Sequence, residues 1–260
     1  MPSHLDRCRR LLEHVLDAVL PRSCLVCGLP LPSDYKPERT AYEAVCAPCA
    51  EELPWNALAC AQCAAPIDTR VPTETCVACE LAPPAWDRAI TSLRYAPPVD
   101  AMIHRLKFGG SLSDGKFLAS ALALSLRATR PAREDWPDLI TAVPMHPLRR
   151  AQRGFNHAAF LAHALSRELP CVIDTDLRAL RRARWTPAQA KLDAAARLHN
   201  LIDVMRWHGS APPSHVAVVD DVLTTGATSA AVTAALYQAG AQHVEIWACA
   251  RAGRFRPGAK

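Results

Sequence analysis

The sequence predicts an α/β protein, in which a mainly parallel β-sheet flanked by helices follows a small cysteine-rich module. From about residue 86 onward, apolar runs typical of strands alternate with segments typical of helices. Before that point, paired cysteines dominate and no strand–helix alternation surrounds them. The chain has 260 residues and is 50% hydrophobic, which is enough to bury the core of one such domain beside a smaller module.

Residues 1–20 are predicted to form an amphipathic helix that packs on the body of the protein. A helix on a membrane surface is the alternative. Charges interrupt the start of the chain, and no window reaches the roughly 18 uninterrupted apolar residues that a membrane helix needs. We therefore expect no signal peptide, no membrane insertion and a cytoplasmic location. The apolar residues with helical spacing are Leu5, Cys8, Leu11, Leu12, Val15, Leu16 and Val19.

Four C-x-x-C pairs follow between residues 24 and 79. Two residues between cysteines let both thiolates face one ion, and two such turns complete a closed tetrahedral site. Residues 21–85 are therefore predicted to be a double zinc ribbon with two structural Zn²⁺ ions, whose binding energy supports folding. Pairing in sequence order places the first two turns on one ion, and an interleaved pairing stays open. The predicted ligands are Cys24, Cys27, Cys46, Cys49, Cys60, Cys63, Cys76 and Cys79.

Disulfides or a redox dithiol are disfavoured for these cysteines by the expected compartment. Residues 1–85 carry seven Lys and Arg against eleven Asp and Glu, and the remainder carries 23 against 14. The acidic first part lacks a basic helix with finger spacing, which argues against a sequence-specific DNA-binding finger. The basic second part favours phosphates or nucleic acid as partners, although many basic surfaces only confer solubility.

Residues 86–260 are predicted to form the sheet domain. Because ligands of such sheets bind beyond the carboxyl ends of the strands, the loops that follow the strands are the candidate sites. The predicted strands lie near 88–95, 138–143, 215–221 and 243–249, and the predicted helices near 98–107, 114–129, 156–168, 188–203 and 227–239.

The segment VAVVDDVLTTGATSAAV, residues 216–232, follows a strand with two acids and then with hydroxyls around one glycine. Amide groups at the helix start, the hydroxyls and the close backbone approach that Gly226 allows would together cradle a phosphate. A plain capped corner is the alternative, and the G-x-x-x-x-G-K-[ST] and G-x-G-x-x-G patterns are absent here. Asp220 and Asp221 are placed to accept hydrogen bonds from two ribose hydroxyls. The predicted cradle is Thr224, Thr225, Gly226, Ala227 and Thr228.

This order of strand, two acids, apolar residue and TTGAT resembles the signature of type I phosphoribosyltransferases, whose ligand is phosphoribosyl pyrophosphate. The resemblance implies catalytic roles for Asp220 and Asp221, with Mg²⁺ bound together with the ligand. It also implies that the loop after the 138–143 strand holds the pyrophosphate, since backbone amides and arginines neutralise a leaving group. The residues of this pyrophosphate loop are Pro144, Met145, His146, Arg149, Arg150 and Arg153.

RGFN at 153–156, together with YAPPVDAMIHRLKFGG and RARWTPAQAKLDAAARLHN, is similar to the ComF family of competence-associated bacterial proteins. The resemblance covers nearly the whole chain and implies a zinc ribbon joined to a phosphoribosyltransferase-type domain. It implies phosphoribosyl transfer to an acceptor that the sequence does not specify, in connection with DNA uptake. The alternative is a non-catalytic adaptor or ligand sensor that handles single-stranded DNA and contacts competence proteins. Relatives often carry an aromatic residue a few positions after the R..N element, where this chain has NLIDVMRW, residues 200–207.

Further polar residues have two interpretations each. Lys107 could approach a phosphate or interact with its helix dipole. Thr186 and Gln189 fit a helix cap, and the resemblance places them near the acceptor. None of the ten histidines has a clear acid–base partner in the sequence, and Cys171 and Cys249 are most simply core residues. A solvated surface or a nucleic-acid contact would suit the basic run Arg178, Arg181, Arg182 and Arg184.

Overall fold

The computed structural model describes residues 22–32, 35, 44–67, 74–130, 136–171, 173–182 and 205–253. The chain forms two compact units, Met1–Leu53 and Pro54–Lys260. The helices predicted at 1–20 and at 188–203 lie outside the described residues. Within the described ranges, no helix combines the length and the apolar character needed to cross a membrane.

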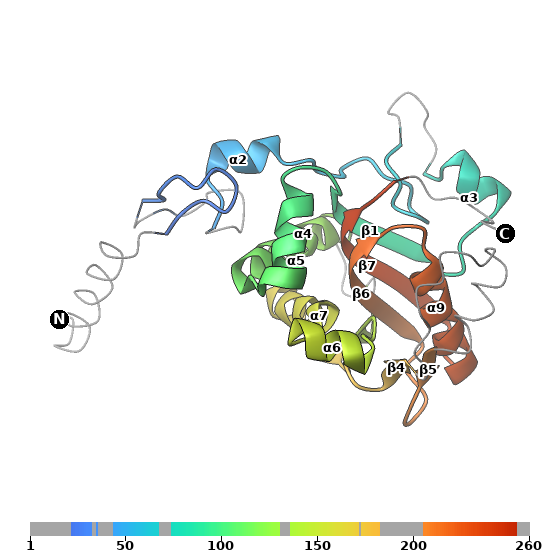
Figure 1. Cartoon of the computed structure of the whole chain (residues 1–260). Helices are drawn as coiled ribbons and strands as arrows, with labels where there is room; N and C mark the ends of the chain where they lie inside the picture. Colours follow the sequence, from blue (N-terminus) through green and yellow to red (C-terminus); the bar gives the residue numbers. More distant parts are fainter. Residues whose placement is uncertain are drawn as a thin grey trace, which may run out of the picture. The chain divides into compact units, whose positions relative to one another are not determined.

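A five-stranded sheet with the order β1-β7-β6-β2-β3 organises the second unit (Figure 1). All four pairings between neighbouring strands are parallel, which confirms the predicted fold class. Because β6 and β7 are central, both are buried along almost their whole length, as their near-continuous apolar sequences predict. The strands are β1 (Arg88–Arg94), β2 (Leu139–Ala142), β3 (Asp174–Thr175), β6 (His215–Leu223) and β7 (His243–Arg251).

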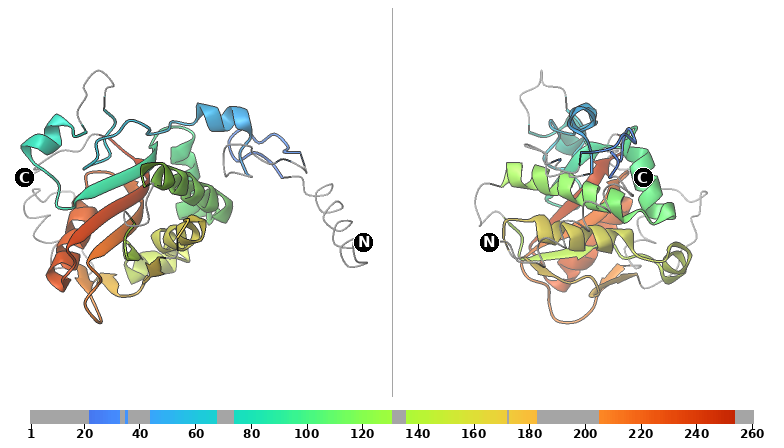
Figure 2. Two further views of the ribbon diagram at one scale, coloured as in Figure 1. Left: turned by 180° about the vertical axis from the view of Figure 1, so that it is seen from behind. Right: turned by 90° about the vertical axis from the view of Figure 1, so that its left-hand side faces the viewer.

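Helices cover both faces of this sheet. α4 (Val99–Gly109), α5 (Leu112–Thr129) and α7 (His157–Glu168) lie on one face, and α9 (Ala227–Ala239) lies on the other (Figure 1 and Figure 2). Val216 and Val218 share a core cluster with Leu236 of α9. Since side chains alternate along a strand, Ala217 and Val219 point to the opposite face, the one that α7 covers.

Three short strands and three helices of five to seven residues were not predicted. β3 has two residues, and β4 (Leu180–Arg182) pairs antiparallel with β5 (Met205–Trp207). Segments of two or three residues are too short to display the alternation that identifies a strand. α6 (Pro147–Arg153) occupies the segment predicted as a loop with a basic cluster. Its signal was present, because Pro147 stands at the first helical position and the preceding His146 accepts a hydrogen bond from the Leu148 amide.

The two cysteine modules repeat one local structure. Residues 23 and 30 form a bridge around the first turn, and residues 59 and 66 form the corresponding bridge around the second. The next pair of cysteines then opens a short helix, α2 (Ala47–Glu52) in the first module and α3 (Val77–Leu81) in the second. The repeated pattern of paired cysteines therefore produces two copies of one ribbon.

The second module belongs to the same compact unit as the sheet. The division between units falls at Leu53 and Pro54, inside the segment 21–85 that the motifs assign to the double ribbon. Residues 54–61 run along β1, where the Asn56 amide donates to the Ser92 carbonyl and the Ala89 amide donates to the Ala61 carbonyl. The boundary between the two compact units is therefore set by these hydrogen bonds and not by the spacing of the cysteine motifs.

Candidate functional site

Two tetracysteine clusters provide the metal sites. Within each cluster, the four sulfur atoms lie within 4.8 Å of one another. The Cys27 and Cys46 sulfurs are 3.8 Å apart and the Cys63 and Cys76 sulfurs 3.7 Å apart. A tetrahedron with Zn–S bonds of about 2.3 Å has edges of about 3.8 Å, so both clusters fit Zn²⁺. The pairing is sequential, with Cys24, Cys27, Cys46 and Cys49 in one cluster and Cys60, Cys63, Cys76 and Cys79 in the other.

Both sites are structural in character. Cys46 and Cys76 each donate a backbone amide hydrogen bond to a sulfur of the opposite turn, at Cys24 and Cys60, over 3.4 and 3.3 Å. Such bonds fix the orientation of the thiolates around the ion. Four cysteines complete the tetrahedral set and leave no position for a reacting molecule, so chemistry must take place elsewhere.

The acid pair lies at the carboxyl end of β6, where the parallel sheet offers a ligand site. Because the strand remains regular to Leu223, Asp220 and Asp221 point to opposite faces of the sheet. The Asp221 amide donates a hydrogen bond of 2.8 Å to Oδ1 of Asp220. Burial, and then the charge of Asp221, raise the pKa of Asp220 to about 8. The neighbouring carboxyls therefore differ in protonation at neutral pH.

Asp221 is held by two basic side chains from the helices of its face. Lys107 Nζ at the end of α4 lies 2.7 Å from Oδ1, and His157 Nε2 at the start of α7 lies 2.7 Å from Oδ2. Burial alone would raise the pKa of Asp221, but the hydrogen bond from His157 and the charge of Lys107 outweigh it and lower the pKa. Asp221 is thus an ionised, paired carboxylate. The contact of Lys107 with the acid is a role that neither interpretation from the sequence included.

The predicted cradle occupies the turn from β6 into α9. Gly226 adopts a left-handed conformation with φ of 83° and caps α9 without a side-chain hydrogen bond. Thr224 and Thr225 are exposed, and the Thr225 hydroxyl accepts a hydrogen bond of 3.4 Å from the Ala227 amide. The first turn of α9 therefore presents backbone donors beside exposed hydroxyls, which suits an anion.

The pyrophosphate loop faces the acid pair across one cavity of about 220 Å³. Asn156 connects this loop to α7, because its side chain donates to the Val143 carbonyl and accepts from the Ala158 amide. Of the predicted residues, Thr224, Thr225, Gly226 and Ala227 are not among those that line the cavity, and Arg150 lines a neighbouring one. The predicted residues that line it are Pro144, Met145, His146, Arg149, Arg153, Asp220, Asp221 and Thr228.

A second cavity of about 820 Å³ adjoins the first and shares Pro144, Met145, Asn156 and Arg182 with it. Phe155 and Phe160 form part of its wall, with ring centroids 6.0 Å apart. Among the described residues that line it, the charged ones are all arginines and none is a carboxylate. The arginines are Arg150, Arg178, Arg181 and Arg182.

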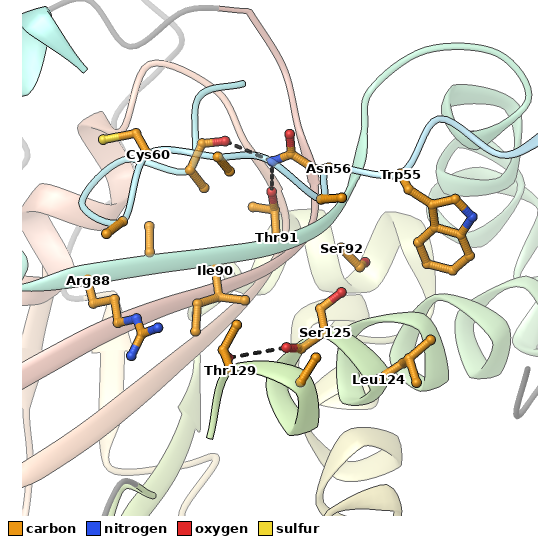
Figure 3. Close-up of a pocket in the computed structure, with 16 residues that line it drawn as sticks. Trp55, Asn56, Cys60, Arg88, Ile90, Thr91, Ser92, Leu124, Ser125 and Thr129 are labelled. Carbon is orange, nitrogen blue, oxygen red and sulfur yellow. Dashed lines mark hydrogen bonds between the residues drawn. The ribbon is translucent and has the colours of Figure 1, made fainter. Parts of the chain in front are cut away.

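A third cavity, of about 400 Å³, lies between the second ribbon, β1 and α5 (Figure 3). Its hydroxyl groups are engaged within the protein, since Ser92 donates to the Cys249 carbonyl and Thr129 to the Ser125 carbonyl. Asn56 donates to the Ala64 carbonyl of the ribbon and to the Thr91 hydroxyl of β1. This cavity is mainly a packing feature of the ribbon on the sheet.

Sequence reasoning missed the role of His157. It lies 64 positions before Asp221 and has no carboxylate near it in the sequence, so only the packing of α7 on β6 could reveal the pair. Thr186, Gln189 and Arg184 lie outside the described residues. Cys249 is fully buried, which confirms the core assignment, whereas Cys171 is partly exposed.

Fold and site together define an α/β protein with a double zinc ribbon and an acid-and-arginine cavity at the carboxyl ends of its strands. A family model described as double zinc ribbon domain matches residues 15–80. The chain is 33% identical to DNA utilization protein YhgH of Escherichia coli K12 over 234 residues, which covers 89% of this chain and 98% of that protein. It is also 33% identical to competence protein F of Haemophilus influenzae over 181 residues, 68% of this chain and 78% of that one.

The chain therefore belongs to the ComF family, as its motifs predicted. Among solved structures, a purine phosphoribosyltransferase from Pyrococcus horikoshii matches 53% of this chain and 73% of its own, at 20% identity and a TM-score of 0.30.

Proposed function

We propose that the protein binds phosphoribosyl pyrophosphate in the 220 Å³ cavity and transfers the phosphoribosyl group to an acceptor. One observation carries the proposal: two acids lie at the carboxyl end of β6, a hydroxyl-rich helix start follows this strand, and an arginine-bearing loop follows the adjacent β2. Phosphoribosyl pyrophosphate has a phosphate at one end, a diphosphate at the other and a ribose between them. The helix start suits the phosphate, the acids suit the ribose, and the arginines suit the diphosphate. The competence and DNA-utilization names of the relatives support a role in handling DNA or its components.

Each part of the cavity has a separate task in this proposal. Residues 224–228, of which Thr228 lines the cavity and the other four lie in the adjoining turn, bind the 5′-phosphate through hydroxyls and the amides at the start of α9. Asp220 accepts hydrogen bonds from the ribose, and Asp221, oriented by Lys107 and His157, lies beside it. Arg149 and Arg153 neutralise the pyrophosphate.

Mg²⁺ prefers carboxylate, phosphate and water oxygens, and the acid pair with a bound diphosphate offers that donor set. When bound, the ion would neutralise charge on the diphosphate. In the transfer, a nucleophile of the acceptor forms a bond to the anomeric carbon as the bond to pyrophosphate breaks, and pyrophosphate leaves with the electron pair. The arginines stabilise the charge that develops on this leaving group.

Calorimetric titration of phosphoribosyl pyrophosphate with Mg²⁺ tests the proposal. Asp220→Asn keeps the size of the side chain but replaces the carboxyl, which can bind Mg²⁺ once deprotonated, by an amide, and we expect it to weaken binding by about tenfold or more, or about 1.4 kcal/mol. Asp174→Asn is the matched control, because Asp174 is exposed and pairs with the first residue of β2, at the amino end of the sheet. Absence of binding by the unaltered protein, or equal binding by Asp220→Asn, would overturn the proposal.

A second candidate function is binding of single-stranded DNA in the 820 Å³ cavity. Four arginines and two phenylalanines line it, and exposed arginines with aromatic rings suit a phosphate backbone with stacked bases. Fluorescence anisotropy with an oligonucleotide at rising salt tests this function. Double replacement of Arg178 and Arg181 by alanine should reduce the salt slope by about 1.4, since each phosphate contact contributes about 0.7. A slope equal to that of the unaltered protein, or no binding at low salt, would exclude this site.

A further inference from the structure

We propose that Arg251 is a positioning residue that connects the second zinc ribbon to the phosphate-binding turn, so that metal in this ribbon determines the order of that turn. This inference deepens the proposed function by adding a metal-dependent control of its cradle. The connection itself is independent of which anion the turn binds.

Arg251 is the last residue of β7 and is buried, with 2% of its surface exposed. Its Nη1 donates to the Leu223 carbonyl over 2.8 Å and to the Thr224 carbonyl over 2.6 Å. Its Nε donates to the Cys63 carbonyl over 2.9 Å. One guanidinium therefore binds two backbone segments. The first is the end of β6 where the turn begins, and the second is Cys63, a zinc ligand of the second ribbon.

The position of these contacts gives them their effect. Leu223 ends β6 and Thr224 begins the turn that leads to Gly226 and α9. A carbonyl held at each of the two residues sets the direction in which the chain leaves the strand. Because Arg presents its donors in a rigid planar fork, the turn and the ribbon are held in a fixed geometry.

The second ribbon also supplies the negative charge that the buried Arg251 cation needs. Among the described residues, no carboxylate forms an ion pair with Arg251. A buried cation without a counterion is costly. Zn²⁺ with four thiolates carries a net charge of about −2. The loaded second cluster, whose Cys63 carbonyl contacts Arg251, supplies this opposite charge.

Hydrogen bonds attach the second ribbon to the sheet, so a change in its metal content can affect Arg251. Asn56 bridges the Ala64 carbonyl and Thr91 of β1 (Figure 3). Trp86 donates from Nε1 to the Gln62 carbonyl over 2.7 Å. Because Gln62 and Ala64 are held on either side of Cys63, loss of the metal would act mainly on Cys63, whose carbonyl is one of the groups that hold Arg251.

Hydrogen exchange on the full chain, loaded with zinc and without phosphoribosyl pyrophosphate, tests the connection. The amides of Ala230 and Ala252 report on it, because they donate to the Gly226 and Leu223 carbonyls. Arg251→Lys keeps the charge and removes the fork. We expect it to retain two zinc ions per chain and to raise exchange in residues 222–231 and at Ala252 at least tenfold, with α7 unchanged. Arg94→Lys, at the exposed end of β1, is the matched control.

A second measurement does not depend on the folding of that variant. In Cys76→Ser, loss of metal from the second cluster should raise exchange in residues 222–231, whereas Cys24→Ser, in the other compact unit, should not. Unchanged exchange in Arg251→Lys with both ions bound, or an equal rise in both cysteine variants, would overturn the inference. Since no ligand is present, failure of ligand binding by the unaltered protein would contradict the proposed function and leave this result intact.

Discussion

Replacing Lys107 by methionine tests whether Asp221 is a buried carboxylate that depends on its partners. Lys107 Nζ lies 2.7 Å from Asp221, and the side chains are 23% and 6% exposed. Removing one partner of a fully buried ion pair costs about 3–5 kcal/mol. Because Lys107 is partly exposed and His157 still holds the other oxygen, we expect a loss of about 2 kcal/mol in the free energy of unfolding. For a unit of this size, that corresponds to about 4–8 °C in Tm.

Denaturant unfolding of the zinc-loaded protein in a double-mutant cycle with Asp221→Asn isolates the pairwise energy. The coupling between the two positions should be about 2 kcal/mol, within the range of directly contacting charges. Arg127→Met is the control, because its ion pair with Glu168 is 3.8 Å long and exposed on both sides, and such pairs contribute less than about 1 kcal/mol. A coupling below about 0.5 kcal/mol would refute the assignment of Asp221 as a paired, ionised group.

Three further predictions concern pH, metal and packing. The pKa of Asp220 is raised in the folded state to about 8, so its stabilising contribution is complete below the ordinary carboxyl pKa and is lost as pH rises toward 8. Asp220→Asn should therefore gain stability relative to the unaltered protein between pH 6 and pH 8.5 in thermal melts, and a constant difference would contradict this. Cys60→Ser should lower the Tm of the sheet unit, whereas Cys24→Ser should leave this Tm unchanged. Calorimetry measures the Tm, with the zinc content determined in parallel. Equal effects of the two variants would contradict the division at residue 53. Gly115→Ala should destabilise the protein by about 1–2 kcal/mol in denaturant unfolding, because its Cβ would lie 2.5 Å from Cε1 of Phe160 and overpacking outweighs the gain in helix propensity. In this variant, Phe160→Leu should restore part of the loss, since Leu106 Cδ1 would also lie 2.9 Å from the new Cβ, and absence of any rescue would contradict the overlap with Phe160 as the cause.

The fold was predictable where the sequence carries long, regular signals. The valines and alanines of residues 215–223 identify a buried strand, and the glycine after residue 239 identifies the end of the helix that follows. β3, β4 and β5 have two or three residues each, so tertiary pairing and not local pattern determines them. The order of strands in the sheet also depends on long-range pairing that no single segment encodes.

The candidate site divides in the same way. The zinc ligands were predictable because a tight turn must present both thiolates from neighbouring positions, although only the folded chain decides the sequential pairing. The acids at the end of β6 were predictable from their position after an apolar run. His157 and Arg251 were not, because each acts on backbone or side chains more than 25 positions away. Their chemistry depends on which elements become neighbours.

The hydrogen bonds of residues 54–61 to β1 have a consequence for how the protein behaves in concentrated solution. β1 is an edge strand, and exposed edges recruit strands from other molecules. Pro54, Asn56 and Ala61 occupy hydrogen-bonding positions along this edge, with the Arg94 amide donating to the Pro54 carbonyl. At the opposite edge, β3 has only two residues, too few to template a growing ladder. The metal-binding segment therefore also covers the edge of the sheet and prevents self-association. A chain that begins at residue 54 should remain monomeric, whereas a chain that begins at residue 86 should aggregate.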